Sequence, residues 1–164
     1  MEPLNWDAPE PQEWDGATAR VAPPARRLAG FIVDVLVIVV ILFFVVVSFV
    51  DVDELAPTEP IPTRVLFVSQ LIVVVYMVSF TATRGQTPGK MAARTKVVDM
   101  DTGEIPSWSQ AFVRETLPVL VGAIPTFGFL TFVIYAWLLW DPRNQGLHDK
   151  AARTLVIDID RLRR

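Results

Sequence analysis

The side chain with the clearest capacity for chemistry is Asp34, an acid inside an otherwise apolar run from Leu28 to Val50. About 20 such residues span the hydrocarbon core of a bilayer, so the run is a candidate transmembrane helix. An ionisable group there costs roughly 2.5–3.5 kcal/mol on insertion scales and usually faces a partner inside the protein. Two interpretations of Asp34 stay open: a static buried ion pair, or a carboxyl group that carries a proton or a cation.

Three further charged residues complete a predicted network. Arg27 lies seven residues before Asp34, close to two helical turns, so the two side chains share one helix face. Arg114 enters a later apolar segment to a similar depth, and we expect it to pair with Asp34 about two turns inside the membrane. Arg27 and Asp149 are expected nearer the interface. The alternative for Arg114 is to extend to the interface without a specific mate.

Polar side chains near this network suggest a possible path for a proton or a cation. The path would run through Asp34, through Ser69 and Gln70 in the second apolar segment, and through His148. Imidazole titrates near neutrality, so His148 is a candidate proton relay, although a hydrogen-bonding residue in a turn is the simpler interpretation. One histidine supplies no metal cluster, because zinc takes three or four ligands. We expect no metal and no cofactor.

The remaining composition argues against an enzyme and against a nucleic-acid partner. The chain has no cysteine, which excludes thiol nucleophiles, disulfides and cysteine–metal sites. The Gly89-Lys90 pair has no GxxxxGK[ST] pattern around it and reads as a turn rather than a phosphate-binding loop. The basic residues are dispersed among acidic ones, which is not the pattern of a nucleic-acid surface. Beside membrane helices they are suited to anionic lipid headgroups instead.

The charged residues must be positioned by three apolar regions, Leu28–Val50, Val65–Thr81 and Leu117–Trp140. The chain is 52% hydrophobic with a mean hydropathy of +0.40, and its apolar residues come in runs, which is typical of a membrane protein. Basic residues precede the first region and follow the second, while acids dominate the loop between them. This charge pattern places the N-terminus in the cytoplasm.

An internal repeat decides how the third region crosses the membrane. Residues 83–101 align without gaps to residues 142–160, with nine identities in 19 positions. Two copies of one unit should lie on the same side, so the chain between them must cross an even number of times. We therefore predict a short hairpin, with one helix from Ser109 to Ile124, a turn at Pro125–Gly128, and a second helix to Trp140. One kinked span with the C-terminus outside is the alternative.

The ends of the two repeat copies read as short strands. ARTKVVD and ARTLVID are β-branched runs bounded by acids and turn residues. A lone strand leaves its backbone groups unpaired, so residues 94–98 and 153–157 are each other's most natural mates.

The domain organisation follows from these elements. Residues 1–25 are rich in proline and acids and lack periodicity, which predicts a disordered cytoplasmic tail. Residues 26–160 form one membrane domain that contains the repeat, and residues 161–164 are a basic end. The predicted fold is an all-α polytopic helical bundle of two long transmembrane helices and a short helical hairpin, with two small cytoplasmic β-strands.

The chain resembles the RDD family of small bacterial membrane proteins, named for one arginine and two aspartates. The matching pieces are RRLAGFIVD, RGQTPGKMAARTKVVDMDTG, the arginine of SQAFVRET, and QGLHDKAARTLVI. By position, the resemblance assigns the arginine to Arg27, the first aspartate to Asp34 and the second to Asp149, with Asp141 a weaker choice. The role of the family is largely unsettled, and cation/proton exchange is proposed for some members. The long acidic tail departs from the family pattern.

Two functions follow as hypotheses. The first is a non-enzymatic accessory or assembly module of the bacterial inner membrane, with both termini in the cytoplasm. The alternative is a cation/proton transporter that acts as an oligomer through Asp34. The expected partners are the lipid bilayer and other membrane proteins or a second copy of the chain. A wet cavity joining Asp34 to Ser69 and Gln70 would favour transport, and tight apolar packing there would favour the accessory role.

Overall fold

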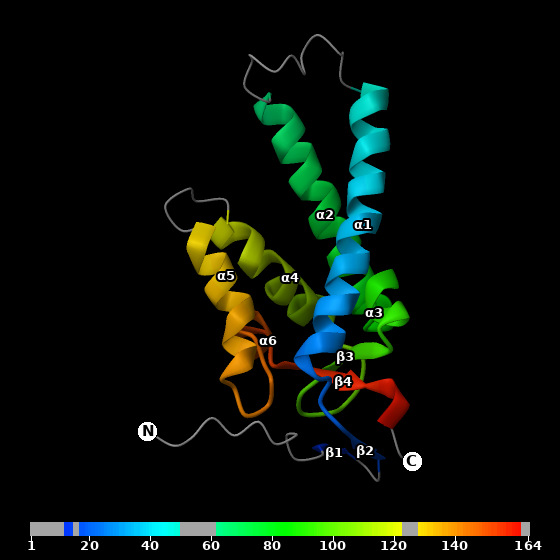
Figure 1. Ribbon diagram of the computed structural model, residues 1–164, viewed down its shortest axis with the longest axis vertical. Coiled ribbons are helices and arrows are strands. Elements are labelled where there is room, and N and C mark those ends of the chain that lie inside the picture. The colour runs from blue at the N-terminus through cyan, green and yellow to red at the C-terminus, as the bar shows by residue number, and fades with distance from the viewer. Residues whose placement is uncertain (1–11, 15–16, 50–61, 123–127, 162–164) are drawn as a thin grey trace.

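The structure is a computed structural model that describes residues 12–14, 17–49, 62–122 and 128–161. Two long helices dominate it, α1 (Pro24–Phe49) and α2 (Thr63–Arg84). Both are long and apolar enough to cross a membrane, as the sequence predicts. They run side by side at one end of the molecule and spread apart toward the other (Figure 1). The loop predicted between them lies largely outside the described residues.

Local sequence explains where these helices begin and end. Pro24 is the first residue of α1, a position where the missing N–H of proline costs nothing. Gly85 ends α2 in the left-handed conformation with φ of 66°, and its N–H donates to the carbonyl of Thr81. Glycine accepts this conformation without strain. The chain then continues through Gln86 to the next short helix.

The third apolar region forms two helices, α4 (Trp108–Gly122) and α5 (Gly128–Ala136), followed by the 3-10 turn η3 (Trp137–Leu139). The two helices pack against each other, and the Thr131 hydroxyl donates to the Pro118 carbonyl at 3.4 Å. This confirms the expected pair of short helices over one continuous kinked helix. At a rise of 1.5 Å per residue, α4 is about 22 Å long, less than the roughly 30 Å of a bilayer core. The predicted turn lies mostly outside the described residues.

Each repeat copy folds into a short helix followed by a strand. The first contains α3 (Pro88–Ala92) and β3 (Thr95–Asp99), and the second contains α6 (Leu147–Ala151) and β4 (Thr154–Asp158), which ends in the turn η4 (Ile159–Arg161). The strands pair antiparallel, with Val97 opposite Val156. The predicted pairing is confirmed, with each strand starting one residue later than expected.

The two copies share details of backbone geometry. Arg94 and Arg153, at equivalent positions, both have positive φ, 54° and 53°. Gln86 and Gln145, also equivalent, each donate a side-chain hydrogen bond to the carbonyl of the first strand residue, Thr95 or Thr154, at 2.8 and 2.9 Å. The same sequence signals therefore produce the same helix–turn–strand geometry twice.

The N-terminal segment differs from the prediction. Residues 12–14 and 17–19 form a small antiparallel hairpin, β1 (Gln12–Trp14) and β2 (Ala17–Ala19). Beyond it, Val21 bridges Ile157 and the Ala22 N–H donates to the Val156 carbonyl at 2.8 Å. The expectation of a disordered tail through residue 25 is therefore wrong for the described part of this segment. The small apolar residues Val21 and Ala22 pair with the open edge of β4. The composition of the tail does not reveal this pairing.

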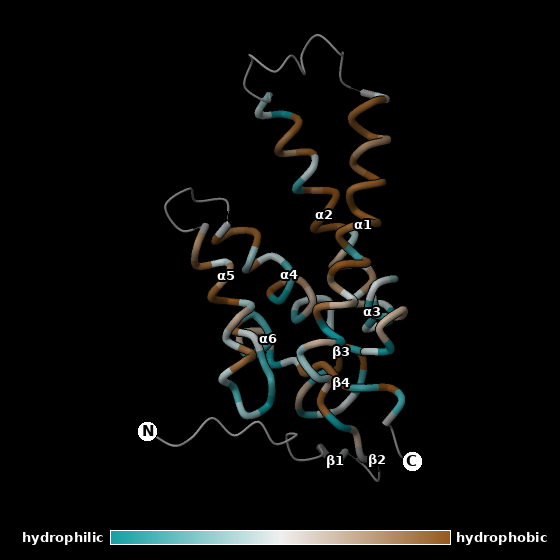
Figure 2. Tube along the Cα trace, in the orientation of Figure 1, coloured by the Kyte–Doolittle hydropathy of each residue, from teal (hydrophilic) through white to brown (hydrophobic). Residues whose placement is uncertain are grey.

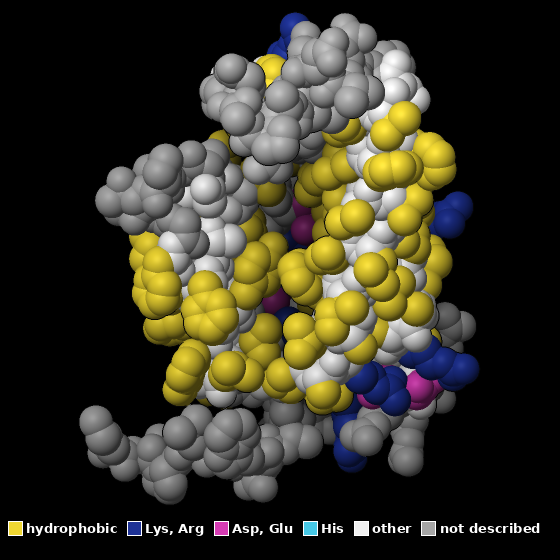
Figure 3. All heavy atoms as spheres, turned by 45° about the horizontal axis from the view of Figure 1, so that its top comes forward, with side chains coloured by type: hydrophobic (Ala, Val, Ile, Leu, Met, Phe, Trp, Pro, Cys, Tyr) yellow, Lys and Arg dark blue, Asp and Glu magenta, His cyan; other side chains and the backbone are white. Residues whose placement is uncertain are grey.

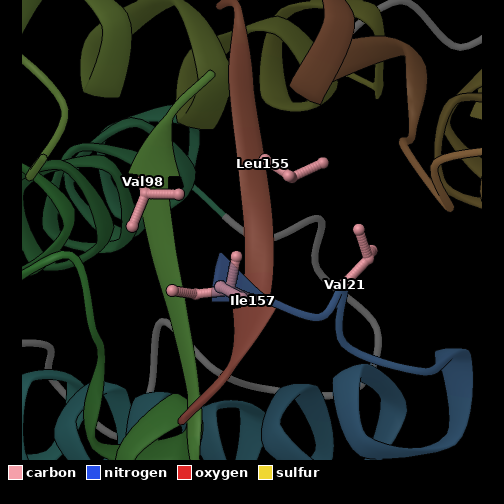
Figure 4. Packing of buried hydrophobic residues seen from close by; sticks show 5 residues of the cluster. Val21, Val98, Leu155 and Ile157 are labelled. Carbon is pink, nitrogen blue, oxygen red and sulfur yellow. The ribbon is translucent and has the colours of Figure 1, made fainter. Parts of the chain in front are cut away.

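The apolar core outside the long helices lies around β4, whose five residues are all buried. One cluster joins Ala19 and Val21 to Val98, Leu155 and Ile157 (Figure 4). Val21, from the N-terminal segment, lies next to β4 in this view. The N-terminal segment thus supplies part of the core that supports the start of α1.

The rest of the apolar surface is exposed on the helices. Figure 2 shows mostly hydrophobic colour along α1, hydrophobic colour with hydrophilic interruptions along α2, and more hydrophilic colour around β3, β4 and α6. In space-filling view the flanks of α1 and of the α4–α5 pair are covered by hydrophobic side chains (Figure 3). Phe44 and Phe67 are 63% and 69% exposed, which suits lipid contact and would be costly in water.

Candidate functional site

Asp34 occupies a buried site built from three elements, here called the Asp34 site: Asp34 on α1, Tyr76 on α2, and Thr87 and Gly89 at the start of α3. The Tyr76 hydroxyl donates to Oδ1 at 3.0 Å and the Gly89 N–H donates to Oδ1 at 2.8 Å. The Thr87 hydroxyl donates to Oδ2 at 2.5 Å. Since Asp34 is only 1% exposed, these neutral donors replace the water that a carboxylate normally requires.

The sequence Thr87-Pro88-Gly89-Lys90 makes this site possible. Thr87 is the N-cap of α3 and Pro88 follows at its first position, a standard helix start. The helix begins so close to α1 that a Cβ on Gly89 would lie 2.1 Å from the Gly30 carbonyl oxygen and 2.6 Å from Cγ of Asp34. Only glycine permits this approach, which brings the Gly89 N–H to the carboxylate.

A second buried carboxylate, Asp149, lies among charged side chains, here called the Asp149 cluster: Arg27, Arg114, Glu115, His148 and Asp149. Arg27 Nη1 lies 2.9 Å from Oδ2 of Asp149, and Arg114 Nη1 contacts Oδ1. The Gly146 N–H donates to Oδ2 at 3.0 Å. Burial alone raises the pKa of Asp149, but the charges of Arg114 and Arg27 outweigh it and hold that pKa well below its usual range.

Arg114 connects this cluster to neighbouring elements. It donates to Oγ1 of Thr154 at 3.2 Å and, through Nε, to Oε1 of Glu115 at 3.1 Å. The Thr81 hydroxyl on α2 donates to the same Glu115 oxygen at 2.9 Å. The Asp149 cluster therefore joins α1, α2, α4, α6 and β4. Figure 3 shows acidic and basic side chains at the bottom of a hollow between α1 and the α4–α5 pair.

His148 lies at the edge of the Asp149 cluster. Its Nε2 is 3.5 Å from Oδ1 of Asp149 and its ring centroid is 4.7 Å from that of Tyr135. Burial lowers the pKa of His148 to about 4, so the imidazole is neutral at physiological pH. Its Nδ1 is buried without a hydrogen-bond partner in the described residues. The surroundings of His148 thus fit a packed neutral side chain.

The predicted pairing of Asp34 with Arg114 is wrong. Arg114 points to Asp149 and Thr154, while neutral donors surround Asp34. A similar expected depth does not fix the direction in which a helix presents its side chain. Arg27 and Asp149, which the sequence placed at one level, do form an ion pair.

The residues of the possible proton or cation path lie in three separate places. Asp34 is in its own site and His148 is in the Asp149 cluster. Ser69 lines an otherwise apolar groove between α1 and α2, and Gln70 is exposed. Ser69 lies two helical turns from Tyr76, the α2 partner of Asp34, which is about 10 Å along the axis.

That groove is formed by seven residues from the outer parts of α1 and α2, of which six are apolar. They are Val39, Leu42, Phe43, Val46, Val65, Leu66 and Ser69.

Sequence reasoning missed several members of these sites. Tyr76 and Thr87 have no distinguishing pattern in the sequence. The one available signal was the TPGK turn, because a helix that starts there leaves backbone N–H groups free to bind an acceptor. Arg26 also has a role: its Nη1 lies 2.7 Å from Asp158 and 2.9 Å from Asp160, at the end of β4. The adjacent arginines thus point to different partners, Arg26 to the end of the sheet and Arg27 to the buried Asp149.

Asp141, the weaker choice for the second family aspartate, is held separately. It contacts Lys150 and accepts hydrogen bonds from the N–H groups of Arg143 and Gln145 at 3.0 and 3.1 Å. These contacts organise the turn before α6. Asp149 is the aspartate that binds Arg27.

The described residues contain no group of three or more histidine and acidic side chains arranged to hold a metal ion. Comparison with known families adds one finding: a model of the RDD family matches residues 21–153. Searches of curated proteins and of solved structures found no match. The matched range includes Asp34 and Asp149 with their arginine and tyrosine partners.

Proposed function

The chain belongs to the RDD family, and from this premise we propose that it is a non-enzymatic accessory or assembly module of the bacterial inner membrane. In this proposal α1 and α2 cross the bilayer and the α4–α5 pair enters it from the side that carries the sheet. That side is the cytoplasm, where both termini lie. Its partners are the bilayer and other membrane proteins.

The observation that carries the proposal is the apolar groove between α1 and α2. Beyond Asp34, residues 35–47 of α1 are all apolar, and Ser69 is the only polar residue in the groove. A carrier needs polar groups or water along the path of its ion, because an ion in hydrocarbon is strongly unfavourable. The groove instead suits an apolar segment, either lipid or a transmembrane helix of a partner.

The buried charges support the same function. Asp149 is bound by two arginines and a backbone N–H, and Asp34 by two hydroxyls and a backbone N–H. Carboxylates satisfied in this way act as cross-links between elements. They hold the sheet end of the bundle rigid and leave the outer halves of α1 and α2 available to a partner. The duplicated helix–strand unit would then be a scaffold that presents these helices.

One observation favours the second candidate, a cation/proton transporter that acts through Asp34 as an oligomer. In the described residues, the groups that hydrogen-bond to Asp34 are all neutral. Ionisable residues within membrane-spanning helices often mark the path of an ion or a proton. In an oligomer, a neighbouring copy would have to supply the polar path that this chain lacks.

Proteoliposomes separate the two functions. The purified chain is reconstituted with an entrapped pH indicator, and Na⁺ or K⁺ gradients are imposed. We expect no proton movement beyond that of empty vesicles, and the same result for Asp34→Asn. Proton movement that depends on the cation gradient and disappears in Asp34→Asn would replace the accessory role with transport.

A crosslinking experiment tests the accessory role directly. A photo-crosslinking amino acid is placed in the groove at Leu66 and, as a control, at Phe44, an exposed position outside the groove. We expect a discrete protein adduct from position 66 in intact cells and none from position 44. Equal adducts from both positions would indicate nonspecific collision in the membrane.

A further inference from the structure

Six basic side chains in the described chain form ion pairs with acidic residues, whether they are buried or exposed. The paired residues are Arg26, Arg27, Arg94, Arg114, Lys150 and Arg153. Even Arg94 and Arg153, whose side chains are 69% and 64% exposed, reach a carboxylate at 2.8 Å. A basic residue that has no acidic partner and lies at the edge of the apolar surface is therefore a candidate to bind an anion from outside the chain.

Two such residues lie near the end of α2. Arg84 is the last residue of this helix and is exposed. Lys96, in β3, packs over Gly85, the residue that follows Arg84: a Cβ on Gly85 would lie 3.1 Å from Lys96 Cε. In the described residues neither side chain forms an ion pair or donates a hydrogen bond. Arg20, Lys90 and Arg143 also form no ion pair there, but none of them belongs to a membrane-length helix, and Lys90 donates to Oγ1 of Thr87 at 3.4 Å.

The surroundings of Arg84 mark a boundary between apolar and polar surface. Its guanidinium carbon lies 5.9 Å from the ring centroid of Phe80, one turn earlier on α2. The rest of α2 toward Thr63 exposes large apolar residues such as Phe67 and Val75. The carbonyl groups at the end of α2 attract cations, which explains the position of both residues but leaves their N–H donors unused. Two cations with free donors at the edge of an apolar helix suit a phosphate group.

We propose that Arg84 and Lys96 bind the phosphate of an anionic phospholipid, such as phosphatidylglycerol, at the sheet end of α2. The proposal rests on the membrane placement of α1 and α2 proposed above. The lipid is favoured over a free phosphate ion because the cations adjoin an apolar helix face that would contact its acyl chains. The contact would fix the depth of α2 in the bilayer.

The chain has no cysteine, which allows a sharp test. Thr83 is exposed next to Arg84, so Thr83→Cys carries a bimane fluorophore at the site. The labelled protein is reconstituted in vesicles that contain either phosphatidylglycerol or phosphatidylcholine with a nitroxide near the top of the acyl chain. We expect stronger quenching by the glycerol lipid. Arg84→Gln and Lys96→Gln should each lower this preference by up to about fivefold, which corresponds to about 1 kcal/mol per basic residue at an anionic surface.

The matched control is the double variant Arg94→Gln and Arg153→Gln, which removes two exposed but paired charges and should keep the preference. Circular dichroism in detergent checks that every variant retains its helices. An unchanged preference without Arg84 and Lys96, or an equal loss in the control, would overturn the proposal. Inorganic phosphate that abolishes the preference at constant ionic strength would assign the site to a free anion. Equal quenching by both lipids refutes the lipid site alone, whereas no quenching by either refutes the membrane placement.

Discussion

Arg27 Nη1 lies 2.9 Å from Oδ2 of Asp149, a residue 122 positions later in the chain. The Asp149 side chain is fully buried and that of Arg27 is 11% exposed. Because Arg114 binds the other oxygen of the same carboxylate, one aspartate joins the start of α1 to α4 and α6. Arg27 and Asp149 thus form a single structural link, while Asp34 occupies a different site.

Removing the shared carboxylate should destabilise the protein strongly. Asp149→Asn leaves the buried Arg27 without its acidic partner and Arg114 with Glu115 alone, and breaking a buried pair typically costs about 3–5 kcal/mol. We expect a lower abundance in membranes and a lower thermal unfolding temperature in detergent. Asp101→Asn, which removes the exposed partner of Arg153, is the control and should change either measurement little.

Double-mutant cycles should distinguish the true partner of Arg114 from the one that depth alone suggested. Arg114→Gln combined with Asp149→Asn should lose much less stability than the sum of the single losses, because the two charges disappear together. Arg114→Gln combined with Asp34→Asn should be additive within about 0.5 kcal/mol. Coupling between Arg114 and Asp34 in the unfolding free energies would contradict the contacts described above.

Gly89→Ala should disrupt the packing of α3 on α1. The new methyl group would overlap the Gly30 carbonyl and the Asp34 carboxyl group, and overpacking of this kind costs roughly 1–3 kcal/mol. Gly122→Ala is a suitable control, since its nearest neighbour is the side-chain oxygen of Thr131 at 3.0 Å, which can move. Thermal unfolding of both variants in detergent checks the difference. A normal unfolding temperature for Gly89→Ala would mean that α1 and α3 are less closely packed.

Stability should fall as the pH drops from about 6.5 to about 4. The pKa of His148 is lowered by burial from 6.5 to about 4, so in this window the unfolded chain binds a proton that the folded chain does not. The stability that comes from keeping His148 neutral in the folded chain is fully present above pH 6.5 and is lost by pH 4. His148→Gln should flatten this part of the profile of unfolding temperature against pH. The lowered pKa of Asp149 acts in a separate window, below the usual pKa of an aspartate near 3.9.

The N-terminal segment should be divisible into a dispensable and a structural part. Deletion of residues 2–11 should change stability little. Deletion of residues 2–22 removes Val21 and Ala22 from the edge of β4, and loss of one buried valine alone corresponds to roughly 1.5–3 kcal/mol. Unfolding temperatures of both truncated proteins test this. Equal stability would show that β4 does not need its second neighbour.

Cysteine labelling tests the proposed orientation. Thr58→Cys lies in the loop between α1 and α2, outside the described residues, and should react with an impermeant thiol reagent on spheroplasts, whose inner membrane the reagent can reach. Glu104→Cys is exposed beyond β3 and should react only after the membrane is opened. Labelling of both in sealed spheroplasts would place the sheet on the outer side.

The amino-acid sequence alone determined the elements whose causes are local. The length of an apolar run decides whether a helix can span a bilayer, so the regions around α1 and α2 were found directly. The repeated ART motif and the β-branched residues after it were sufficient to predict β3, β4 and their pairing. Pro125 and Gly128, which interrupt the third apolar region, likewise predicted that α4 and α5 are separate helices. Each of these inferences depends on neighbouring residues and on solvent preference.

Only the tertiary structure decided which charged groups meet. Arg114 and Asp34 carry opposite charges, yet the rotation of α4 about its axis turns Arg114 toward Asp149. Asp34 is instead satisfied by Tyr76, Thr87 and the Gly89 N–H, because two glycines allow α3 to approach α1. Partner choice at distances near 3 Å depends on the rotation and separation of helices. Those are set by packing of the whole chain, and no local pattern encodes them.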